Sequence, residues 1–350
     1  MRDQDVLVVI PCLNEERTLA SVLQRLLADE GSARCLFVVA DGGSQDMSWA
    51  VAGDYCARLP GRVARIRNDL RFQAAAVNAA VRQFGTGRTW LIRIDAHAHY
   101  PEGYITGLIG AASVSAADSV VVPMRSVGAT CLQRGIAAAQ NSILGTGGSA
   151  HRHPGRSFWV EHGHHALFRL DVFERVGGYD PTFTHNEDAE LDFRLARAGA
   201  RIWLDGASAI QYLPRRGFAS LFAQYRAYGR GRARTALLHS MKLRLRQQLP
   251  LAVPLTLLLA AFAPLAPVLA MPAAAWLSAC LAAGGMSAIR DRSVCSLASG
   301  PALAVMHFGW AVGFWSQLLA GARAPARIEG AARSGLNGVE AEWQGRRRAS

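Results

Sequence analysis

Three short apolar runs in the first hundred residues each end at acidic side chains. They read VLVVIPCLNEE from Val6 to Glu16, LFVVADGGSQD from Leu36 to Asp46, and WLIRIDAHAHYP from Trp90 to Pro101. Runs of this length and composition are typical of strands that are buried in a parallel sheet. Charged groups at the carboxyl end of such a strand cost free energy unless a ligand or ion needs them there. The pattern therefore predicts an α/β fold with a binding site at one edge of its sheet.

Helical patterns alternate with these runs, which favours a Rossmann-like, mostly parallel sheet with helices on both faces. The expected strands are Val6–Ile10, Leu36–Ala40, Val63–Ile66, Trp90–Asp95 and Ser119–Pro123. The expected helices are Thr18–Ala28, Asp46–Ala57, Phe72–Phe84 and Gly103–Ala112. After residue 125 the pattern is less regular, and its expected elements are the helix Glu187–Ala198 and the strands Arg201–Leu204 and Ala209–Tyr212.

Two long stretches near the C-terminus carry no charge, Leu249–Ile289 and Ser293–Ala322. Each exceeds the roughly 20 residues that a helix needs to cross a bilayer. The first stretch contains five prolines, which favours either two short membrane segments in a hairpin or one span with a re-entrant piece. The expected division of the chain is residues 1–125 and 126–247 as the donor and acceptor halves of one catalytic domain, 248–322 as two to three membrane helices, and 323–350 as a disordered basic tail.

The net charge of +12 is concentrated just before the first apolar stretch, where basic residues are dense from Arg215 to Arg246. This placement predicts a cytoplasmic side and contact with anionic membrane lipids. Nucleic acid, the other common partner of a basic chain, is not expected because no nucleic-acid-binding motif occurs. Val6–Ile10 is too short for a secretory leader, so we expect the catalytic part in the cytoplasm, at the inner membrane. In that reducing compartment the six cysteines, which show no CxxC spacing, are expected to be buried thiols.

Asp41 directly follows an expected strand and precedes two glycines, which allow a tight turn and close backbone approach. No GxGxxG or P-loop motif occurs in the chain. The carboxylate can accept a hydrogen bond from a nucleobase N–H or a ribose hydroxyl. The alternative is a local Asx turn.

Asp95 and His97 follow another expected strand, and residues two apart on an extended chain face the same way. A carboxylate and an imidazole facing one ion suit Mn²⁺ or Mg²⁺, and the imidazole favours Mn²⁺. The alternative is a capping aspartate beside a surface histidine.

Glu187 and Asp188 begin an amphipathic helix. Acidic residues stabilise the first turn of a helix by complementing its dipole, which is one interpretation of the pair. The other is that a carboxylate held at the start of a buried helix acts as a rigid general base.

Two further clusters have open interpretations. His162, His164 and His165 lack the HExxH spacing of a zinc hydrolase, so a strand edge beside an acceptor or phosphate is preferred over a zinc site. Basic side chains in QYRAYGRGRAR can form a solvated face beside the membrane, or can bind a diphosphate or lipid phosphate through guanidinium groups. The residues of that second interpretation are Arg226, Arg230 and Arg232.

Taken in order, these segments resemble the family 2 glycosyltransferases over about residues 5–235. The matching runs are VVIPCLNEE, ADGGSQD, Asn78 in QAAAVNAAV, IDAHAHYP, GGYDPTFTHNEDAELDFRLARAG and QYRAYGRGRAR. Within that family, the chain is most similar to the ExoA-type exopolysaccharide glycosyltransferases.

The resemblance implies a GT-A fold, the nucleotide-diphospho-sugar transferase fold, and an inverting, metal-dependent transfer. It implies that Asp95 and His97 occupy the DxD metal position, that Asp188 deprotonates the acceptor, and that Glu187 orients the site. The residues implied to bind the nucleotide sugar are Pro11, Asn14, Glu15, Asp41, Asn78 and Asp95. The DxD motif is Asp-Ala-His here, and the QxxRW motif of processive synthases is absent.

The function implied by the resemblance is transfer of a sugar, with UDP-glucose as the expected donor, to a polyprenyl-diphosphate-linked oligosaccharide. One alternative is transfer to a polyprenyl monophosphate, as in dolichol-phosphate mannosyl synthases. A further alternative is a membrane scaffold that carries an inactive glycosyltransferase domain, but the intact acidic motifs argue against it.

Overall fold

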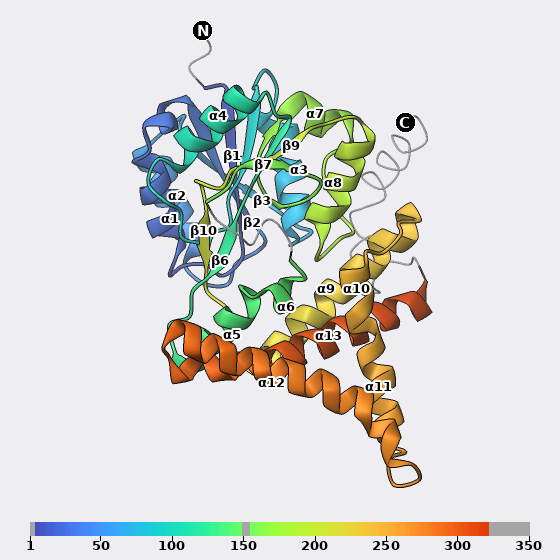
Figure 1. Ribbon diagram of the computed structural model, residues 1–350. Coiled ribbons are helices and arrows are strands. Elements are labelled where there is room, and N and C mark those ends of the chain that lie inside the picture. Colours follow the sequence, from blue (N-terminus) through green and yellow to red (C-terminus); the bar gives the residue numbers. More distant parts are fainter. Residues whose placement is uncertain (1–3, 149–154, 322–350) are drawn as a thin grey trace. The chain divides into compact units, whose positions relative to one another are not determined.

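The structure is a computed structural model that describes residues 4–148 and 155–321 (Figure 1). In this part of the chain, residues 4–124 and 155–211 form one compact unit, and residues 125–148 and 212–321 form a second. Each unit has its own buried apolar core. The predicted basic tail, residues 323–350, lies outside the described residues.

A mixed sheet forms the centre of the first unit (Figure 1). It has eight strands, in the order β3-β2-β1-β4-β8-β5-β9-β7. Its strands are β1 (Val6–Cys12), β2 (Cys35–Asp41), β3 (Val63–Arg67), β4 (Trp90–Arg93), β5 (Ser119–Val122), β7 (Phe158–Val160), β8 (His164–Arg169) and β9 (Ile202–Leu204). The neighbours β3, β2, β1 and β4 are parallel, whereas β8 is antiparallel to both β4 and β5. The predicted α/β architecture is confirmed.

The sheet is covered on both faces because its strands are apolar on both faces. In β1, Val6, Val8 and Ile10 belong to one core cluster, and the alternate residues Leu7 and Val9 belong to the other. All five are fully buried, as expected for a central strand of a parallel sheet. The helices that pack on the first face are α1 (Leu19–Leu27), α2 (Ser48–Arg58) and α4 (Tyr104–Ser115). Those on the second face are α3 (Gln73–Phe84), α7 (Leu170–Arg175) and α8 (Glu187–Arg197).

One strand is shorter than predicted, because β4 ends at Arg93 rather than at Asp95. The backbone N–H of Asp95 donates to the Tyr100 hydroxyl at 2.6 Å, and that hydroxyl donates to the Asp95 carbonyl at 3.1 Å. The side chain of Tyr100 therefore satisfies backbone groups that a continuing sheet ladder would use. The chain turns at residues 96–97 and is no longer extended there.

The second unit is mainly helical. Its helices are α5 (Cys131–Gln140), α6 (Ile143–Thr146), α9 (Phe218–His239), α10 (Leu245–Gln248), α11 (Val253–Ala260), α12 (Met271–Asp291) and α13 (Ser299–Ala320). Strands β6 (Met124–Ser126) and β10 (Ile210–Tyr212) pair as a separate two-stranded sheet where the chain passes between the units.

Helices α9 and α13 approach each other through glycines. A Cβ added at Gly229 would lie 2.1 Å from the Trp310 carbonyl oxygen, and one added at Gly313 would lie 1.9 Å from the Arg226 carbonyl oxygen. Gly309 and Gly313 form a small-residue pair four apart on α13, which is the spacing that lets helix backbones pack closely.

The expectation that all six cysteines are thiols is wrong for two of them. Cys131, at the start of α5, forms a disulfide with Cys295 in the 3₁₀ helix η5 (Val294–Ala298). The partners are 164 residues apart, so no local spacing signalled the bond. Cys12, Cys35 and Cys280 are free and buried.

Two helical segments of the second unit are long and apolar enough to cross a membrane, Pro267–Asp291 and Val294–Ala320. In the apolar 18-residue stretch of the first segment, 17% is buried within the protein, and in that of the second segment 50% is buried. The core helix of a soluble protein can pass the same test of length and composition. Helix α11 has only eight residues and is too short to span a bilayer.

Candidate active site

The carboxyl ends of three adjacent strands, β2, β1 and β4, meet at one edge of the sheet. Asp41 ends β2, Asn14 follows β1, and Asp95 follows β4. Asn14 adopts a positive φ of 57° in the bend that follows its strand. This edge is where open α/β sheets bind their ligands.

Asp41 is almost completely buried and organises the turn that follows it. Its Oδ2 accepts hydrogen bonds from the backbone N–H of Gly43 at 3.0 Å and of Ser44 at 3.2 Å, which is an Asx turn. The same oxygen accepts from Arg67 Nη1 at 2.6 Å. The Arg67 guanidinium stacks on the Trp49 ring at 3.6 Å. A half-exposed cation and an aromatic face therefore lie beside the buried carboxylate.

The turn after β1 is joined to the turn after β2 by side-chain hydrogen bonds. The Oδ1 atom of Asn14 accepts from the Gln45 N–H at 2.8 Å, and the Ser44 hydroxyl accepts from the Asn14 N–H at 2.9 Å. Pro11 lies within β1, opposite Ala40 of β2. These contacts bring the predicted nucleotide-binding residues of both turns into one rigid segment.

Asp95 and His97 have different partners. Asp95 Oδ1 accepts from Gln73 Nε2 at 2.6 Å, whereas His97 Nδ1 lies 2.9 Å from Glu15 Oε1. The prediction that both face one ion assumed an extended chain, and that assumption is wrong because residues 96–97 form a turn. Their role as metal ligands remains a prediction.

Arg93, the last residue of β4, lies at the centre of an acidic cluster. Its guanidinium, 4% exposed, forms a close ion pair with Asp188 and lies 3.3 Å from Asp95 Oδ1 and 3.7 Å from Glu187 Oε1. It also donates to the Tyr179 hydroxyl at 3.2 Å. One buried positive charge therefore meets three carboxylates, so the group carries a net negative charge that can attract a cation.

Three histidines pair with carboxylates of the same region. His164 bridges Asp95 Oδ2 at 3.4 Å and Asp188 Oδ2 at 3.6 Å. His165 is fully buried, with Nδ1 3.2 Å from Asp188 Oδ1 and Nε2 2.7 Å from Asp192 Oδ1. The distance from His162 Nδ1 to Asp192 Oδ2 is 2.7 Å. The histidine cluster therefore supports the acidic helix α8 from the neighbouring strand.

The adjacent acids Glu187 and Asp188 have opposite pKa shifts. Burial opposes the ionisation of Asp188, but the charges of Arg93 and His165 outweigh it and hold its pKa well below the ordinary range. Burial and the neighbouring charge of Asp188 raise the pKa of Glu187 above its ordinary value. Asp188 is thus the firmly ionised member of the pair, and Glu187 is the more basic one.

His165 is held as an imidazolium. Burial alone favours its neutral form, but Asp192, Tyr179 and Asp188 outweigh burial and raise its pKa well above 6.5. The pKa of Asp192 is lowered, because the charge of His165 outweighs the effect of burial. The row Asp188–His165–Asp192 is therefore a buried alternation of negative, positive and negative charges.

Asn78, on α3, is fastened to the protein backbone. Its side-chain nitrogen donates to the Tyr179 carbonyl at 2.7 Å, and its side-chain oxygen accepts from the Tyr179 N–H at 3.0 Å. This pair of bonds positions Tyr179, whose hydroxyl contacts the acidic cluster. The predicted contact between Asn78 and a nucleotide sugar stays a prediction.

The predicted phosphate-binding arginines lie on α9 of the second unit. Arg226 is exposed, and Arg230 and Arg232 are partly buried. Their proposed contact with a diphosphate also stays a prediction.

Three residues of the cluster were not predicted from the sequence, namely Arg93, Tyr179 and Asp192. Arg93 had a signal, because it is the charged residue of an otherwise apolar strand and lies two positions before Asp95, on the same strand face. Asp192 lies four residues after Asp188 and therefore on the same helix face. Tyr179 had no such signal, because its place depends on a long-range contact with α3.

Asp95 fits a divalent cation better than His97 does. Burial raises the pKa of Asp95, but Arg93 and His164 outweigh burial and lower it, so the carboxylate is ionised. Among the described residues, no group of three or more His, Cys, Asp or Glu side chains is arranged to hold a metal ion. Mg²⁺ and related ions commonly bind through one or two carboxylates together with substrate phosphates, and Asp95 suits that mode.

Comparison with known proteins gives three findings. The family model described as Glycosyl transferase family 2 matches residues 7–177. The Succinoglycan biosynthesis protein ExoA of Rhizobium meliloti (strain 1021) is 44% identical over 313 residues, which cover 89% of this chain and 94% of that protein. The structure of mannosyltransferase PcManGT from Pyrobaculum calidifontis, in complex with GDP-Man and Mn²⁺, has a TM-score of 0.56 and 18% identity, and covers 90% of this chain and 87% of its own.

Proposed function

Because the chain belongs to glycosyltransferase family 2 and has the predicted GT-A fold, we propose that it moves a sugar from a UDP-sugar to a lipid-linked oligosaccharide. That it is a glycosyltransferase follows from its family. The proposed pathway is exopolysaccharide assembly, in keeping with the name of its 44% identical relative. The observation that carries the proposal is the convergence of Asp95, Glu187 and Asp188 on the buried Arg93, beside the strand ends that hold Asn14 and Asp41.

The donor nucleotide is proposed to bind at the ends of β1 and β2. Asp41, Asn14, Glu15 and Pro11 would contact the uridine, with the Asp41 carboxylate accepting from the base or ribose. The Asx turn of Asp41 is compatible with this role, because a carboxylate oxygen has lone pairs beyond those that a turn uses. The half-exposed guanidinium of Arg67, which stacks on Trp49, lies beside the same carboxylate.

Asp95 is the proposed protein ligand of Mn²⁺ or Mg²⁺, with His97 as its predicted second ligand. Such an ion, when bound, would neutralise the negative charge of the departing diphosphate. The structurally similar mannosyltransferase PcManGT, in complex with GDP-Man and Mn²⁺, supports a divalent ion for this fold, without distinguishing Mn²⁺ from Mg²⁺ here.

Asp188 is proposed as the general base of an inverting transfer. The acceptor hydroxyl oxygen would form a bond to the anomeric carbon as the bond to UDP breaks, and the hydroxyl proton would pass to Asp188. Geometry supports this choice, because Arg93, His164 and His165 hold the carboxylate in one position. Single displacement at the anomeric carbon inverts its configuration.

Glu187 is a second candidate for the base, and its raised pKa is the observation that favours it. A stronger base accepts a proton more readily, and Asp188 is weakened as a base by its ion pair with Arg93. In the first assignment, Glu187 orients the site. In the second, Asp188 anchors Arg93 and Glu187 takes the proton.

Arg226, Arg230 and Arg232 are proposed to bind the diphosphate of the lipid-linked acceptor. Guanidinium groups pair well with phosphate oxygens, and these three lie on the helix that precedes the apolar segments. Placement at the cytoplasmic face of the inner membrane would bring them to the level of the lipid head groups.

The test is UDP release and product formation by the detergent-solubilised chain with a panel of UDP-sugars. Each donor is offered with a polyprenyl-diphosphate oligosaccharide, with polyprenyl monophosphate, and with no acceptor. The proposal expects product only with the diphosphate-linked oligosaccharide. Product with the monophosphate alone would favour a dolichol-phosphate-mannose-synthase-like reaction, in which the acceptor is already anionic and needs no base.

A further inference from the structure

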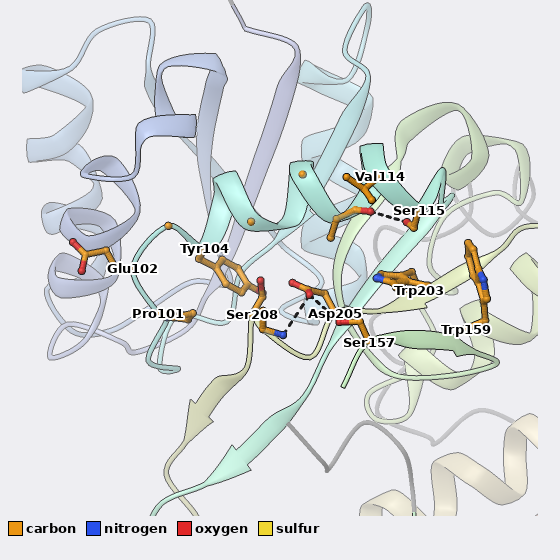
Figure 2. Close-up of a pocket in the computed structure, with 15 residues that line it drawn as sticks. Pro101, Glu102, Tyr104, Val114, Ser115, Ser157, Trp159, Trp203, Asp205 and Ser208 are labelled. Carbon is orange, nitrogen blue, oxygen red and sulfur yellow. Dashed lines mark hydrogen bonds between the residues drawn. The ribbon is translucent and has the colours of Figure 1, made fainter. Parts of the chain in front are cut away.

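A cavity of about 660 Å³ lies in the first unit, beside α4 (Figure 2). Its walls come from α4, β7, β9 and the loop after β9. Helix α4 packs on one face of the sheet, whereas α8, which carries Glu187 and Asp188, packs on the other. The volume is that of a small-molecule site, and the transfer chemistry proposed above does not use it.

Two tryptophan rings form one wall of the cavity. Trp159 of β7 is 46% exposed and makes an edge-to-face contact with Trp203 of β9, with ring centroids 4.9 Å apart. The Arg201 guanidinium lies 4.8 Å from the Trp159 ring. Both rings are therefore fixed by neighbours, while much of the Trp159 surface is left uncovered. An exposed aromatic ring in a concave site usually has a binding role.

The middle of the helix surface that faces the cavity carries small residues. Gly107, Gly110 and Ala111 line it between the side chains of Tyr104 and Val114, and a Cβ added at Gly110 would meet no atom within 4 Å. Glycine in the middle of a helix costs stability relative to alanine. Small residues here keep open a space that larger side chains would fill.

The polar groups of the cavity are acidic or hydroxylic. Glu102 and Asp205 line it together with Ser157 and Ser208, and Figure 2 shows Asp205 and Ser208 near its middle. Asp205 Oδ1 accepts two long hydrogen bonds, from Ser157 Oγ at 3.4 Å and from the Ala207 N–H at 3.3 Å. No lining residue is basic, although the chain as a whole has a net charge of +12.

This chemistry selects among small ligands. The two carboxylates of the lining repel phosphate, and the nearby Arg201 guanidinium lies over the Trp159 ring, so a nucleotide or a lipid diphosphate does not suit the cavity. A sugar ring does, because its C–H face can stack on an aromatic side chain while its hydroxyl groups donate to carboxylates. We propose that this cavity is a second carbohydrate-binding site, which holds a neutral sugar unit of the oligosaccharide on the opposite sheet face from the acidic cluster.

The identification of that sugar as part of the acceptor or product rests on the proposed function. The capacity of the cavity to bind a neutral sugar does not, because it follows from the lining residues alone. Binding and transfer can therefore be tested separately.

The experiment measures binding of neutral tetrasaccharides of glucose to the solubilised full-length chain without nucleotide sugar. Saturation-transfer NMR and calorimetry would be used, and a dissociation constant of about 1 mM is expected for a shallow site of this kind. Trp159→Ala removes the stacking surface. Gly110→Leu fills the cavity from a position where the new side chain meets no neighbour at its Cβ. Each variant should bind about ten-fold more weakly.

Phe158→Ala is the matched control, because Phe158 precedes Trp159 on β7, is 38% exposed and does not line the cavity. It should bind like the wild type, and thermal melting would confirm that all three variants are folded. The proposal is overturned if the wild type binds none of the tetrasaccharides, if both cavity variants bind like the wild type, or if UDP displaces the bound sugar.

The two proposals then fail in different ways. If the chain transfers sugar but binds no tetrasaccharide, only the proposed second site is refuted. If the chain binds tetrasaccharides through Trp159 but transfers no sugar, the second site stands and the proposed donor and acceptor are refuted.

Discussion

Arg93 determines how the two acids at the start of α8 can act. Its ion pair with Asp188 favours the charged form of that carboxylate, while Glu187 lies 3.7 Å away and has a raised pKa. The two assignments of the base therefore differ in where the acid limb of the pH–rate profile falls. If Asp188 is the base, activity should fall only below the ordinary aspartate pKa of 3.8. If Glu187 is the base, activity should begin to fall above its ordinary value of 4.5.

Substitution separates the same two assignments. With Asp188 as the base, Asp188→Asn should lower kcat roughly 10²–10⁴-fold with little change in donor affinity, and Glu187→Gln should cost less. Turnover and UDP binding would be measured on the same preparations. An Asp188→Asn enzyme with near-normal turnover would exclude Asp188, and a greater loss in Glu187→Gln would transfer the role to Glu187.

Removal of the divalent ion tests Asp95. EDTA should abolish turnover, and Mn²⁺ or Mg²⁺ should restore it. Asp95→Ala should weaken UDP binding mainly when metal is present, because the lost contact would be one between protein and ion. His97→Ala should have the smaller effect, since His97 is half exposed and pairs with Glu15 in the structure. Full wild-type turnover in EDTA would contradict the proposed metal role.

Acid should destabilise the first unit through the aspartates that pair with His165. The pKa of Asp192 is lowered in the folded protein, so its stabilisation is present above the ordinary value of 3.8 and is lost as pH falls through the folded value. His165 has a raised pKa, so its contribution is complete below 6.5 and is lost only as pH rises through a much higher value. Stability should therefore hold through neutral pH and decline below about pH 4.

Asp192→Asn tests this pairing. It leaves the buried imidazolium of His165 with Asp188 as its one remaining carboxylate partner and should cost up to about 3–5 kcal/mol at pH 7. The decline of Tm in acid should also become shallower. Asp54→Asn is the matched control, because Asp54 is 60% exposed and its ion pair with Arg58 is a surface contact. Equal Tm losses for the two variants at pH 7 would contradict the assigned role of Asp192.

The local sequence pattern predicted most elements of the first unit, but it did not predict which distant strands pair. The strands β1, β2, β3 and β5 were predicted to within two residues, because apolar runs with clear ends specify buried strands. The place of β8 between β4 and β5 was not predicted, because the sequence HHALFR does not indicate which strands it pairs with. The same limit explains the site. Asp188 stands out by sequence, but its contact with His165 of β8 depends on that antiparallel insertion.

The α9–α13 contact in the second unit should depend on its glycines. Gly313→Ala would place a methyl group 1.9 Å from the Arg226 carbonyl oxygen, so the helices must separate. We expect a loss of about 1–3 kcal/mol, measured as a lower Tm in detergent. Gly285→Ala, on α12, is the control, because its Cβ would meet no atom within 4 Å. It should be neutral or up to about 1 kcal/mol stabilising, and equal effects of the two changes would refute the close approach.

The membrane arrangement connects the charge pattern of the chain to its cysteines. Basic residues before Leu249 and at Arg290 and Arg292 favour a cytoplasmic location for both ends of the first apolar stretch. The Cys131–Cys295 bond lies close in sequence to Arg292, yet disulfides are rare in the cytoplasm. If the positive-inside rule holds, the reducing cytoplasm would open the bond that the structure shows, and Cys131 and Cys295 would be reduced in the cell.

We therefore predict that a reporter fused after Arg292 is cytoplasmic and that alkylation before lysis labels both Cys131 and Cys295. A periplasmic signal at Arg292, together with cysteines that label only after reduction, would place this end of α12 outside and overturn the hairpin.

A second fusion after Arg323 decides whether α13 crosses the membrane. Half of the apolar 18-residue stretch of α13 is buried within the protein, against 17% of the corresponding stretch of α12. This burial favours a helix packed on α9 over a lipid-exposed span. We expect a cytoplasmic signal there as well, and a periplasmic one would show that α13 spans the membrane despite its packing.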